Sequence, residues 1–447
     1  MAALVRRLGT RDAALIVMGG IIGSGIFRNP SVVAKQLHNG PLIVLAWVAG
    51  GAFAILGALL FAELASRRPS NGGLYAYVRD AYHPFVAFEY GWTLLLVSQS
   101  GGMAAAALIF SAYVAPFAGL DPNSALIGKV VPIGVLAILT AINCMGVRVA
   151  ASTQNVFMLL KIAAIAGLIG IGLFAPQATA AVAAEQAATS NGFGLFAIFM
   201  LALVPVIFSY SGWQTASFMT AELRDPEKSL PRGMIYGVLA VVVLYVAVTL
   251  VCLHVLGVNG LSNTGTPASD VMSLVLGPIG QRIMALIVAL STLGFLSNQI
   301  LVSPRVYFQM ARDGVFFKLL ARVNPKTLVP VVAIVLQGVA AAVITCWQGY
   351  ANIVDSVTAI DEIFFGLAAI ALIVFRNRDR RDGVDARIGY RMPGYPYTTV
   401  LFLIVAWGVV VNLLVSRPQD GAVSVGFLLA GVAAYYLFVW GNRRAAQ

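Results

Sequence analysis

Two short stretches decide the fold of this chain: Ile21-Ile22-Gly23-Ser24-Gly25-Ile26-Phe27 and Phe208-Ser209-Tyr210-Ser211-Gly212-Trp213. Each interrupts an apolar segment that is long enough to cross a bilayer. A break in a membrane helix frees backbone N–H and C=O groups, which is tolerated only where protein or a polar ligand satisfies them. A matched pair of broken helices is therefore typical of the substrate site of a membrane transporter.

The composition indicates an integral membrane protein. Of the 447 residues, 60% are hydrophobic and 11% are charged, and the mean hydropathy is +0.88. A soluble domain contains about 25% charged residues. The few cysteines and histidines lie in separate segments and show no metal-ligand spacing or disulfide framework. We therefore expect no metal, no cofactor and no enzyme. These residues are Cys144, Cys252, Cys346, His38, His83 and His254.

Windows of about 20 apolar residues predict an all-α protein with twelve transmembrane helices. The predicted spans are 12–37, 41–66, 84–115, 127–145, 156–174, 194–222, 231–256, 278–308, 330–347, 353–375, 397–415 and 423–440. Segment 267–277 is expected to form a short helix outside the membrane. The two breaks fall in spans one and six, which predicts two inverted repeats of five spans, 12–174 and 194–375, with helices eleven and twelve (397–440) appended. The whole chain, 1–447, is expected to be one domain.

Basic residues orient the predicted spans. With the N-terminus in the cytoplasm, about 23 of the 29 Lys and Arg residues lie inside and about five outside, which follows the positive-inside rule. This predicts cytoplasmic N- and C-termini in a cell (inner) membrane protein. The same topology explains the net charge of +11, so nucleic acid is not an expected partner.

The first break offers an anion site. Where a half-helix restarts near Gly25, the amides of its first turn have no intrahelical partners and carry partial positive charge, which suits a carboxylate. Gly23 and Gly25 would let the backbone approach the ligand closely, and Ser24 adds a hydroxyl donor. The alternative is a glycine-rich packing face that also includes Gly19 and Gly20.

The second break offers the complementary site. A half-helix that ends near Phe208 would leave the carbonyls of Phe208, Ser209 and Ser211 unpaired, with partial negative charge suited to an ammonium group. Together the two breaks would bind the zwitterionic head of an α-amino acid. Taken singly, Tyr210 and Trp213 are also compatible with core packing or an interfacial belt.

These stretches resemble signatures of the amino acid–polyamine–organocation (APC) superfamily. The likeness covers essentially the whole chain and is greatest to bacterial relatives of the L-type amino acid transporters. Further matching stretches are Phe61-Ala62-Glu63-Leu64, Ser70-Asn71-Gly72-Gly73-Leu74-Tyr75, Ala221-Glu222-Leu223-Arg224-Asp225-Pro226-Glu227-Lys228-Ser229-Leu230-Pro231, Pro304-Arg305 and Met310-Ala311-Arg312-Asp313-Gly314. The resemblance implies a LeuT-like (APC) fold and an alternating-access transporter.

The resemblance also implies roles for individual residues. The backbone at Ser24 and Gly25 would hold the substrate carboxylate, and the carbonyls of Ile21, Phe208 and Ser211 its amino group. The ring of Phe208 would close the site as a lid. The full set expected to bind substrate is Ile21, Gly23, Ser24, Gly25, Phe208, Ser209, Ser211 and Gln299.

Two pairs of charged residues lie near the cytoplasmic ends of predicted spans. Glu222 and Arg305 are expected to stabilise or gate the protein rather than to contact substrate. Glu63 lies one turn from Arg67, which predicts a structural ion pair.

Polar clusters on spans three and eight, 98–102 and 297–299, are expected to shape the side-chain pocket. Spans one, three, six and eight hold no central carboxylate, since Glu89 lies close to the start of span three. This favours neutral L-amino acids as substrates. The alternatives are a cationic amino acid or polyamine antiporter, or an amine permease. A channel is disfavoured because the spans are too apolar for a continuous polar lining.

Loop 116–125 contains no cysteine. Eukaryotic L-type relatives use an external loop cysteine to bond an accessory glycoprotein, so no disulfide-linked accessory subunit is expected. The oligomeric state stays open.

Lys161 is the basic residue that the topology leaves inside the membrane. A charge there costs about 2.5–3.5 kcal/mol on insertion scales, so it needs a partner or a function. One interpretation is snorkelling toward the cytoplasmic face. The other is that its ammonium group binds carbonyls near Gly23, where sodium-coupled relatives of this fold hold an ion. The second interpretation predicts a sodium-independent exchanger or proton-linked permease.

Overall fold

The computed structural model describes residues 8–69, 72–118, 124, 126–175, 192–347, 350–383, 389–416 and 418–444. These ranges form helices joined by short connections, with one isolated parallel bridge between Leu8 and Leu223 and no longer strand. The all-helical prediction is therefore confirmed. Most of loop 116–125, on which the accessory-subunit prediction rests, lies outside the described residues.

The helical elements follow one another from Thr10 to Arg444. They are α1 (Thr10–Ile21), α2 (Gly25–Leu37), α3 (Gly40–Arg67), α4 (Leu74–Ala81), α5 (Pro84–Thr93), η1 (Leu94–Ser98), α6 (Gln99–Val114), η2 (Ala115–Ala118), η3 (Leu126–Val130), α7 (Val131–Cys144), α8 (Val147–Leu173), α9 (Gly192–Tyr210), η4 (Trp213–Glu222), α10 (Pro226–Asn263), α11 (Pro267–Leu276), α12 (Pro278–Val302), α13 (Pro304–Arg312), η5 (Lys318–Ala321), α14 (Val331–Trp347), α15 (Tyr350–Arg381), α16 (Tyr397–Ser416) and α17 (Pro418–Arg444).

Each of the twelve predicted spans lies on helix. Within the described residues, nine helices are long and apolar enough to cross a membrane, and the pair α1 and α2, bent by 44°, makes a tenth. The remaining two predicted spans correspond to α7 and α14, which have 14 and 17 residues and are shorter than a simple crossing. The short helix predicted at 267–277 is α11.

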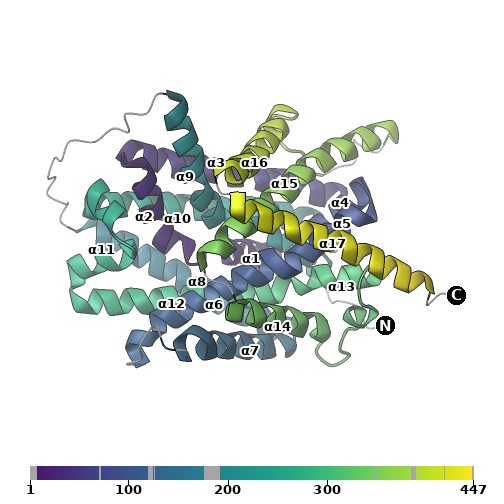
Figure 1. Cartoon of the computed structure of the whole chain (residues 1–447), viewed down its shortest axis with the longest axis horizontal. Coiled ribbons are helices and arrows are strands. Elements are labelled where there is room, and N and C mark those ends of the chain that lie inside the picture. Colours follow the sequence, from purple (N-terminus) through teal and green to yellow (C-terminus); the bar gives the residue numbers. More distant parts are fainter. Residues whose placement is uncertain are drawn as a thin grey trace.

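Helix α1 lies in the middle of the molecule and α2 continues toward its left-hand end, with α7 and α14 along one side and α17 across the front (Figure 1). Small residues allow α1 and α10 to approach closely. A Cβ atom on Gly233 would lie 2.6 Å from the Cβ of Ala13, and one on Gly237 would lie 2.9 Å from Val17. Membrane helices associate through such close backbone approach because lipid supplies no hydrophobic drive between them.

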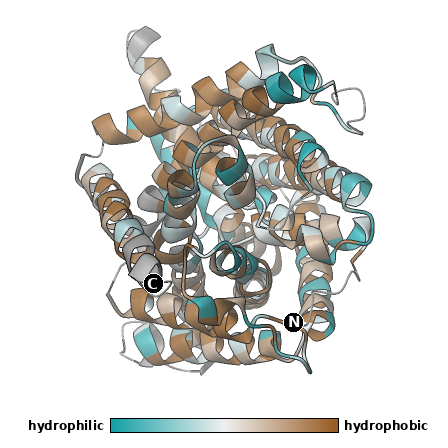
Figure 2. Cartoon of the chain, turned by 90° about the vertical axis from the view of Figure 1, so that its right-hand side faces the viewer, coloured by the Kyte–Doolittle hydropathy of each residue, from teal (hydrophilic) through white to brown (hydrophobic). Residues whose placement is uncertain are grey.

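The two ends of the molecule differ. The chain begins α1 and leaves α17 at the same end, at the right in Figure 1, whereas α2 and α11 lie toward the opposite end. Viewed from the right-hand end, hydrophobic helices surround the molecule and hydrophilic segments gather on the facing loops (Figure 2). This distribution fits a protein whose flanks face lipid and whose ends face water.

A buried charge cluster joins α3 to α15. Glu63 accepts from Arg67 at 2.7 Å, as predicted, but it also pairs with Arg376 at 2.6 Å and accepts from the backbone N–H of Met392 at 2.7 Å. Burial and the Glu63 carboxylate raise the pKa of the Tyr390 hydroxyl in the adjoining loop to about 12. The cluster ties the loop before α16 to the core of the protein.

Candidate functional site

The first break lies between α1 and α2. Helix α1 ends at Ile21, the next residue is extended, and α2 begins at Gly25. Among the described residues, no protein acceptor takes the amide hydrogens of Ser24, Gly25 or Ile26. These amides are therefore unpaired donors at the positive end of a helix, as the sequence predicted.

Side chains from three other helices bind the carbonyls that this break exposes. Each carbonyl accepts one bond, so the backbone is held from outside. The bonds run from Tyr245 Oη of α10 to Ile21 O at 3.1 Å, from Ser291 Oγ of α12 to Gly23 O at 3.1 Å, and from Lys161 Nζ of α8 to Ile22 O. Lys161 is 2% exposed, so the snorkelling interpretation is wrong.

The second break lies between α9 and η4 and differs from the prediction. Helix α9 ends at Tyr210, two residues later than expected, and Gly212 turns the chain with φ 108°. The carbonyl of Phe208 was predicted to be unpaired, but it accepts from the N–H of Ser211 at 3.2 Å. The reason is that the chain makes a tight turn after the helix, which places this N–H over the carbonyl.

The two breaks touch each other. A Cβ atom on Gly25 would lie 2.8 Å from Ser209 Oγ and 3.2 Å from its Cα, and one on Gly20 would lie 2.7 Å from the carbonyl oxygen of Gly212. The packing interpretation therefore holds for Gly20 and Gly25. Gly25 also lines the cavity beside Ser209, so the expectation that it lets a ligand approach the backbone stays a prediction.

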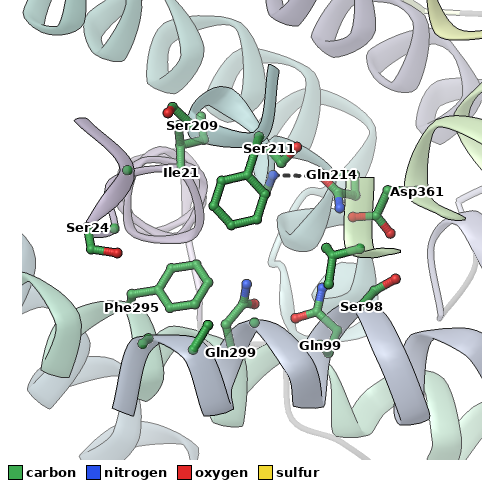
Figure 3. A pocket seen from close by; sticks show the side chains of 18 residues that line it. Ile21, Ser24, Ser98, Gln99, Ser209, Ser211, Gln214, Phe295, Gln299 and Asp361 are labelled. Carbon is green, nitrogen blue, oxygen red and sulfur yellow. Dashed lines mark hydrogen bonds between the residues drawn. The ribbon is translucent and has the colours of Figure 1, made fainter. Parts of the chain in front are cut away.

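All eight residues predicted to bind substrate line one cavity of about 60 Å³. In Figure 3, Ile21 and Ser24 lie on one side, Ser209 and Ser211 above, and Phe295 and Gln299 below. Phe208 also lines the cavity. Lys161 does not line this cavity, but its amino group donates to the carbonyl of Ile22 at the first break.

The opposite wall contains residues that the sequence reasoning did not single out as binding residues, above all Asp361. Ser98 belongs to η1, a π-helical turn, and such turns are frequent at functional sites. Ser98 hydrogen-bonds Asp361 of α15, and Gln214 of η4 lies beside them (Figure 3). Asp361 was missed because spans one, three, six and eight were searched for a central acid and span ten was not. An ionisable residue in an apolar helix is itself the signal that finds it.

A larger cavity of about 970 Å³ shares Ser24 with the first. Its lining includes Arg28, Tyr113, Gln281 and Arg282, contributed by α2, α6 and α12. Ser24 therefore lies between the small cavity and a wide vestibule.

The end at which the chain begins α1 is closed by direct contacts. Glu222 of η4 pairs with Arg305 of α13 at 2.9 Å, and both side chains are buried. The N–H of Leu8 donates to Glu222 O at 3.0 Å, and the N–H of Arg224 donates to Leu8 O at 2.9 Å. The chain before α1 is thereby joined to the segment that follows the second break.

Two broken membrane helices around a small cavity, with a vestibule on one side and buried contacts closing the other, define a transporter. No group of three His, Cys, Asp or Glu residues that could hold a metal ion occurs in the described part of the chain.

The comparisons with known proteins agree with this class. A model of the amino acid permease family matches residues 8–439, and the chain belongs to this family, which is part of the APC superfamily. The chain is 27% identical to a serine/threonine exchanger of Bacillus subtilis over 97% of each protein. It is 29% identical to the mouse b(0,+)-type amino acid transporter 1, over 98% of this chain and 89% of the mouse protein. It is also 29% identical to the human large neutral amino acids transporter small subunit 2, over 98% of this chain and 81% of the human protein. The family and these relatives are transporters and not enzymes.

Proposed function

We propose that this protein exchanges amino acids across the cell membrane by sodium-independent alternating access. The observation that carries the proposal is the single cavity lined by both breaks, with the unpaired amides of Ser24, Gly25 and Ile26 at its edge. The relatives named above support amino acids as the substrate class.

The α-amino acid head group would bind where the breaks meet. Its carboxylate would accept hydrogen bonds from the amides at Ser24 and Gly25, which are strengthened by the helix dipole. Its ammonium group would donate to carbonyls of Ile21, Phe208 and Ser211. The first two already accept one bond each, and a carbonyl oxygen has a second lone pair.

Lys161 supports transport without sodium. Its ammonium group donates to the carbonyl of Ile22 at the first break, so a positive charge already lies there. A sodium ion beside it would be repelled by a like charge at low dielectric. Exchange and proton-linked uptake are both compatible with this arrangement, and the exchanger among the relatives favours exchange.

The helix arrangement supports a specific topology. We propose twelve spans arranged as two inverted five-span repeats, 12–174 and 194–375, with helices eleven and twelve (397–440) appended, and 1–447 as a single domain. Both ends of the chain would be cytoplasmic in the inner membrane. No disulfide-linked accessory subunit is proposed, since loop 116–125 has no cysteine.

The contacts around the cavity support an outward-facing state. In the proposed orientation the vestibule at Arg28 and Arg282 opens outward, and the Glu222–Arg305 pair closes the cytoplasmic side. Phe208 would close over the bound substrate from outside, and release to the cytoplasm would require the buried ion pair to separate.

The test is counterflow in proteoliposomes. Vesicles preloaded with a mixture of unlabelled amino acids should accumulate labelled amino acid in sodium-free buffer, and sodium should not increase the rate. Vesicles preloaded with buffer alone are the control. A dependence on a sodium gradient, or no exchange of any amino acid or polyamine, would overturn the proposal. Exchange of polyamines in place of amino acids would favour the polyamine antiporter.

A further inference from the structure

Two adjacent carboxyl groups lie in the membrane-spanning part of α15. Asp361 is 6% exposed and lines the cavity, and Glu362 is 1% exposed and does not line it. Within the described residues neither forms an ion pair with a lysine or arginine. Asp361 interacts with the hydroxyl of Ser98, and Glu362 lies in the field of Asp361.

An unpaired buried carboxylate is costly. The free-energy cost of removing it from water is offset only by a counter-charge or by several strong hydrogen bonds. A single serine hydroxyl supplies only one such bond. Intramembrane acids are therefore functional by default. Lys161 does not serve as the counter-ion: within the described residues it forms no ion pair with either acid, and its amino group donates to the carbonyl of Ile22.

The position of Asp361 within the cavity decides what it would bind. Ser24 and Asp361 lie on opposite sides of the cavity, with Phe295 and Gln299 toward one end and Gln214 beside the acid (Figure 3). In an α-amino acid the ammonium nitrogen and the carboxyl carbon are bonded to the same Cα, so both stay near the breaks. The group that reaches Asp361 therefore belongs to the substrate side chain.

We propose that Asp361 is the subsite for a positively charged side chain, so that the preferred substrates are amino acids with a side-chain ammonium or guanidinium group. The inference rests on the proposed function and replaces the preference for neutral substrates drawn from the sequence. Ser98 would orient the carboxylate, and the amide groups of Gln99 and Gln214 complete a polar but uncharged surround.

The vestibule does not provide this selectivity. Arg28 and Arg282 line it, so its fixed charge does not attract cations. The selection of charged over neutral side chains is therefore assigned to Asp361 in the small cavity. There a contact between opposite charges is shielded from water and is strongest.

The wild-type protein allows a test that needs no variant. Counterflow rates at low substrate concentration are compared for matched pairs: lysine against norleucine, and arginine against citrulline. Each pair has a similar shape and differs in side-chain charge. We expect the charged member to be exchanged about tenfold or more faster, as charge-assisted hydrogen bonds predict. Equal rates, or faster exchange of norleucine and citrulline, would overturn the inference.

Variants then locate the effect at Asp361. Asp361→Asn should reduce lysine exchange about 10- to 100-fold more than it reduces norleucine exchange, which abolishes the preference. Asp361→Glu keeps the charge and should retain part of the preference. Glu362→Gln, a neighbouring acid outside the cavity lining, is the matched control and should keep the wild-type ratio.

The remaining outcomes are also decisive. If Asp361→Asn lowers lysine and norleucine exchange equally, the acid holds the α-ammonium group or braces α15, and the side-chain subsite is wrong. A third outcome is that only neutral substrates are transported, and that their transport rate depends on a proton gradient in the wild-type protein but not in Asp361→Asn. In that case Asp361 carries a proton and does not bind a charged side chain. In both cases amino acid transport, and hence the proposed function, would stand. No amino acid exchange by the wild-type protein would instead refute the proposed function.

Discussion

The two helix breaks meet at one cavity but keep their shapes in different ways. At the first, Tyr245, Lys161 and Ser291 from three other helices bind successive carbonyls. At the second, the bonds are local: Thr215 Oγ1 donates to Gly212 O at 2.7 Å, and Gly212 N donates to Gln214 Oε1 at 3.1 Å. The carbonyls of the first break are therefore bound by residues far away in the chain, whereas the turn at Gly212 is closed by hydrogen bonds within its own sequence.

This difference has a consequence for transport. Because α8, α10 and α12 bind the first break, its backbone should move when those helices move. Its amides would then face the ligand only while these hydrogen bonds are intact. A break that bonds to itself keeps its turn when neighbouring helices shift. Substitutions at a distance should therefore damage the first break, and substitutions within the turn should damage the second.

The largest effect is expected at Gly212. Its φ of 108° is strained for any residue with a side chain, and a Cβ atom there would collide with the carbonyl of Gly20. Strain of this kind alone costs about 1–3 kcal/mol. Gly212→Ala should lower the apparent melting temperature and abolish exchange.

Gly23→Ala is the matched control for folding. A Cβ atom at Gly23 would meet Phe295 at 3.5 Å, an ordinary contact, and its φ is not positive. Thermal unfolding of both variants in detergent checks the prediction. If Gly212→Ala melts like Gly23→Ala, the turn at the second break does not depend on glycine.

Lys161→Met should follow in size. The thioether side chain keeps most of the volume but cannot bind the carbonyl of Ile22, so the first break loses its charged partner. We expect exchange to fall about tenfold or more while the protein stays folded, because replacing a buried charge by an apolar group of similar size is often tolerated. Exposed Lys129→Met is the control. Exchange at the wild-type rate would contradict the role given to Lys161.

Phe208→Ala should have an intermediate effect on the exchange rate, and it should change this rate more than substrate binding. The side chain lines the cavity and is only partly buried, and the lid interpretation predicts slower exchange with little loss of binding. Pure core packing would instead cost about 3–5 kcal/mol of stability. Ligand-induced thermal shifts and exchange rates of the same preparation separate the two. A variant that is poorly folded, yet exchanges normally per folded molecule, would refute the lid.

The smallest effects are expected for the neutral partners of the first break. Tyr245→Phe and Ser291→Ala each remove one hydrogen bond to a carbonyl, worth about 0.5–1.5 kcal/mol. Each should reduce exchange less than Lys161→Met, and the double variant should approach it. Measured exchange rates give the ranking. If either single variant is worse than Lys161→Met, the charge is not what fixes the first break.

The sequence was sufficient for whatever depends on local chemistry. Glycine interruptions in apolar segments located both breaks and, with them, Ser24 and Phe208 in the cavity, and the polar cluster on span eight located Gln299. What it could not supply is the partner of each exposed group. The bond from Ser211 to the Phe208 carbonyl depends on turn geometry, and the contact of Gly25 with Ser209 joins segments that are distant in the chain.

Lys161 and Asp361 both show that the sequence identifies a residue but not its neighbours in the fold. Both are ionisable residues in apolar helices and can be recognised as such from the sequence. The predicted position of Lys161 at the first break is confirmed by its hydrogen bond to the carbonyl of Ile22. Asp361 was not predicted because only spans one, three, six and eight were considered for a central acid, whereas the fold also brings the helix of span ten to the cavity.

The central claim is that the amides at Ser24 and Gly25 hold the carboxylate of an amino acid. The most direct measurement is the thermal shift of the purified protein with the amino acid that is exchanged fastest, with its methyl ester, and with its decarboxylated amine. At a concentration of 100 Kd the amino acid should stabilise the protein by about 2.7 kcal/mol, and at the same concentration the other two should have little effect. If the amine stabilises the protein as well as the amino acid does, the carboxylate site is wrong.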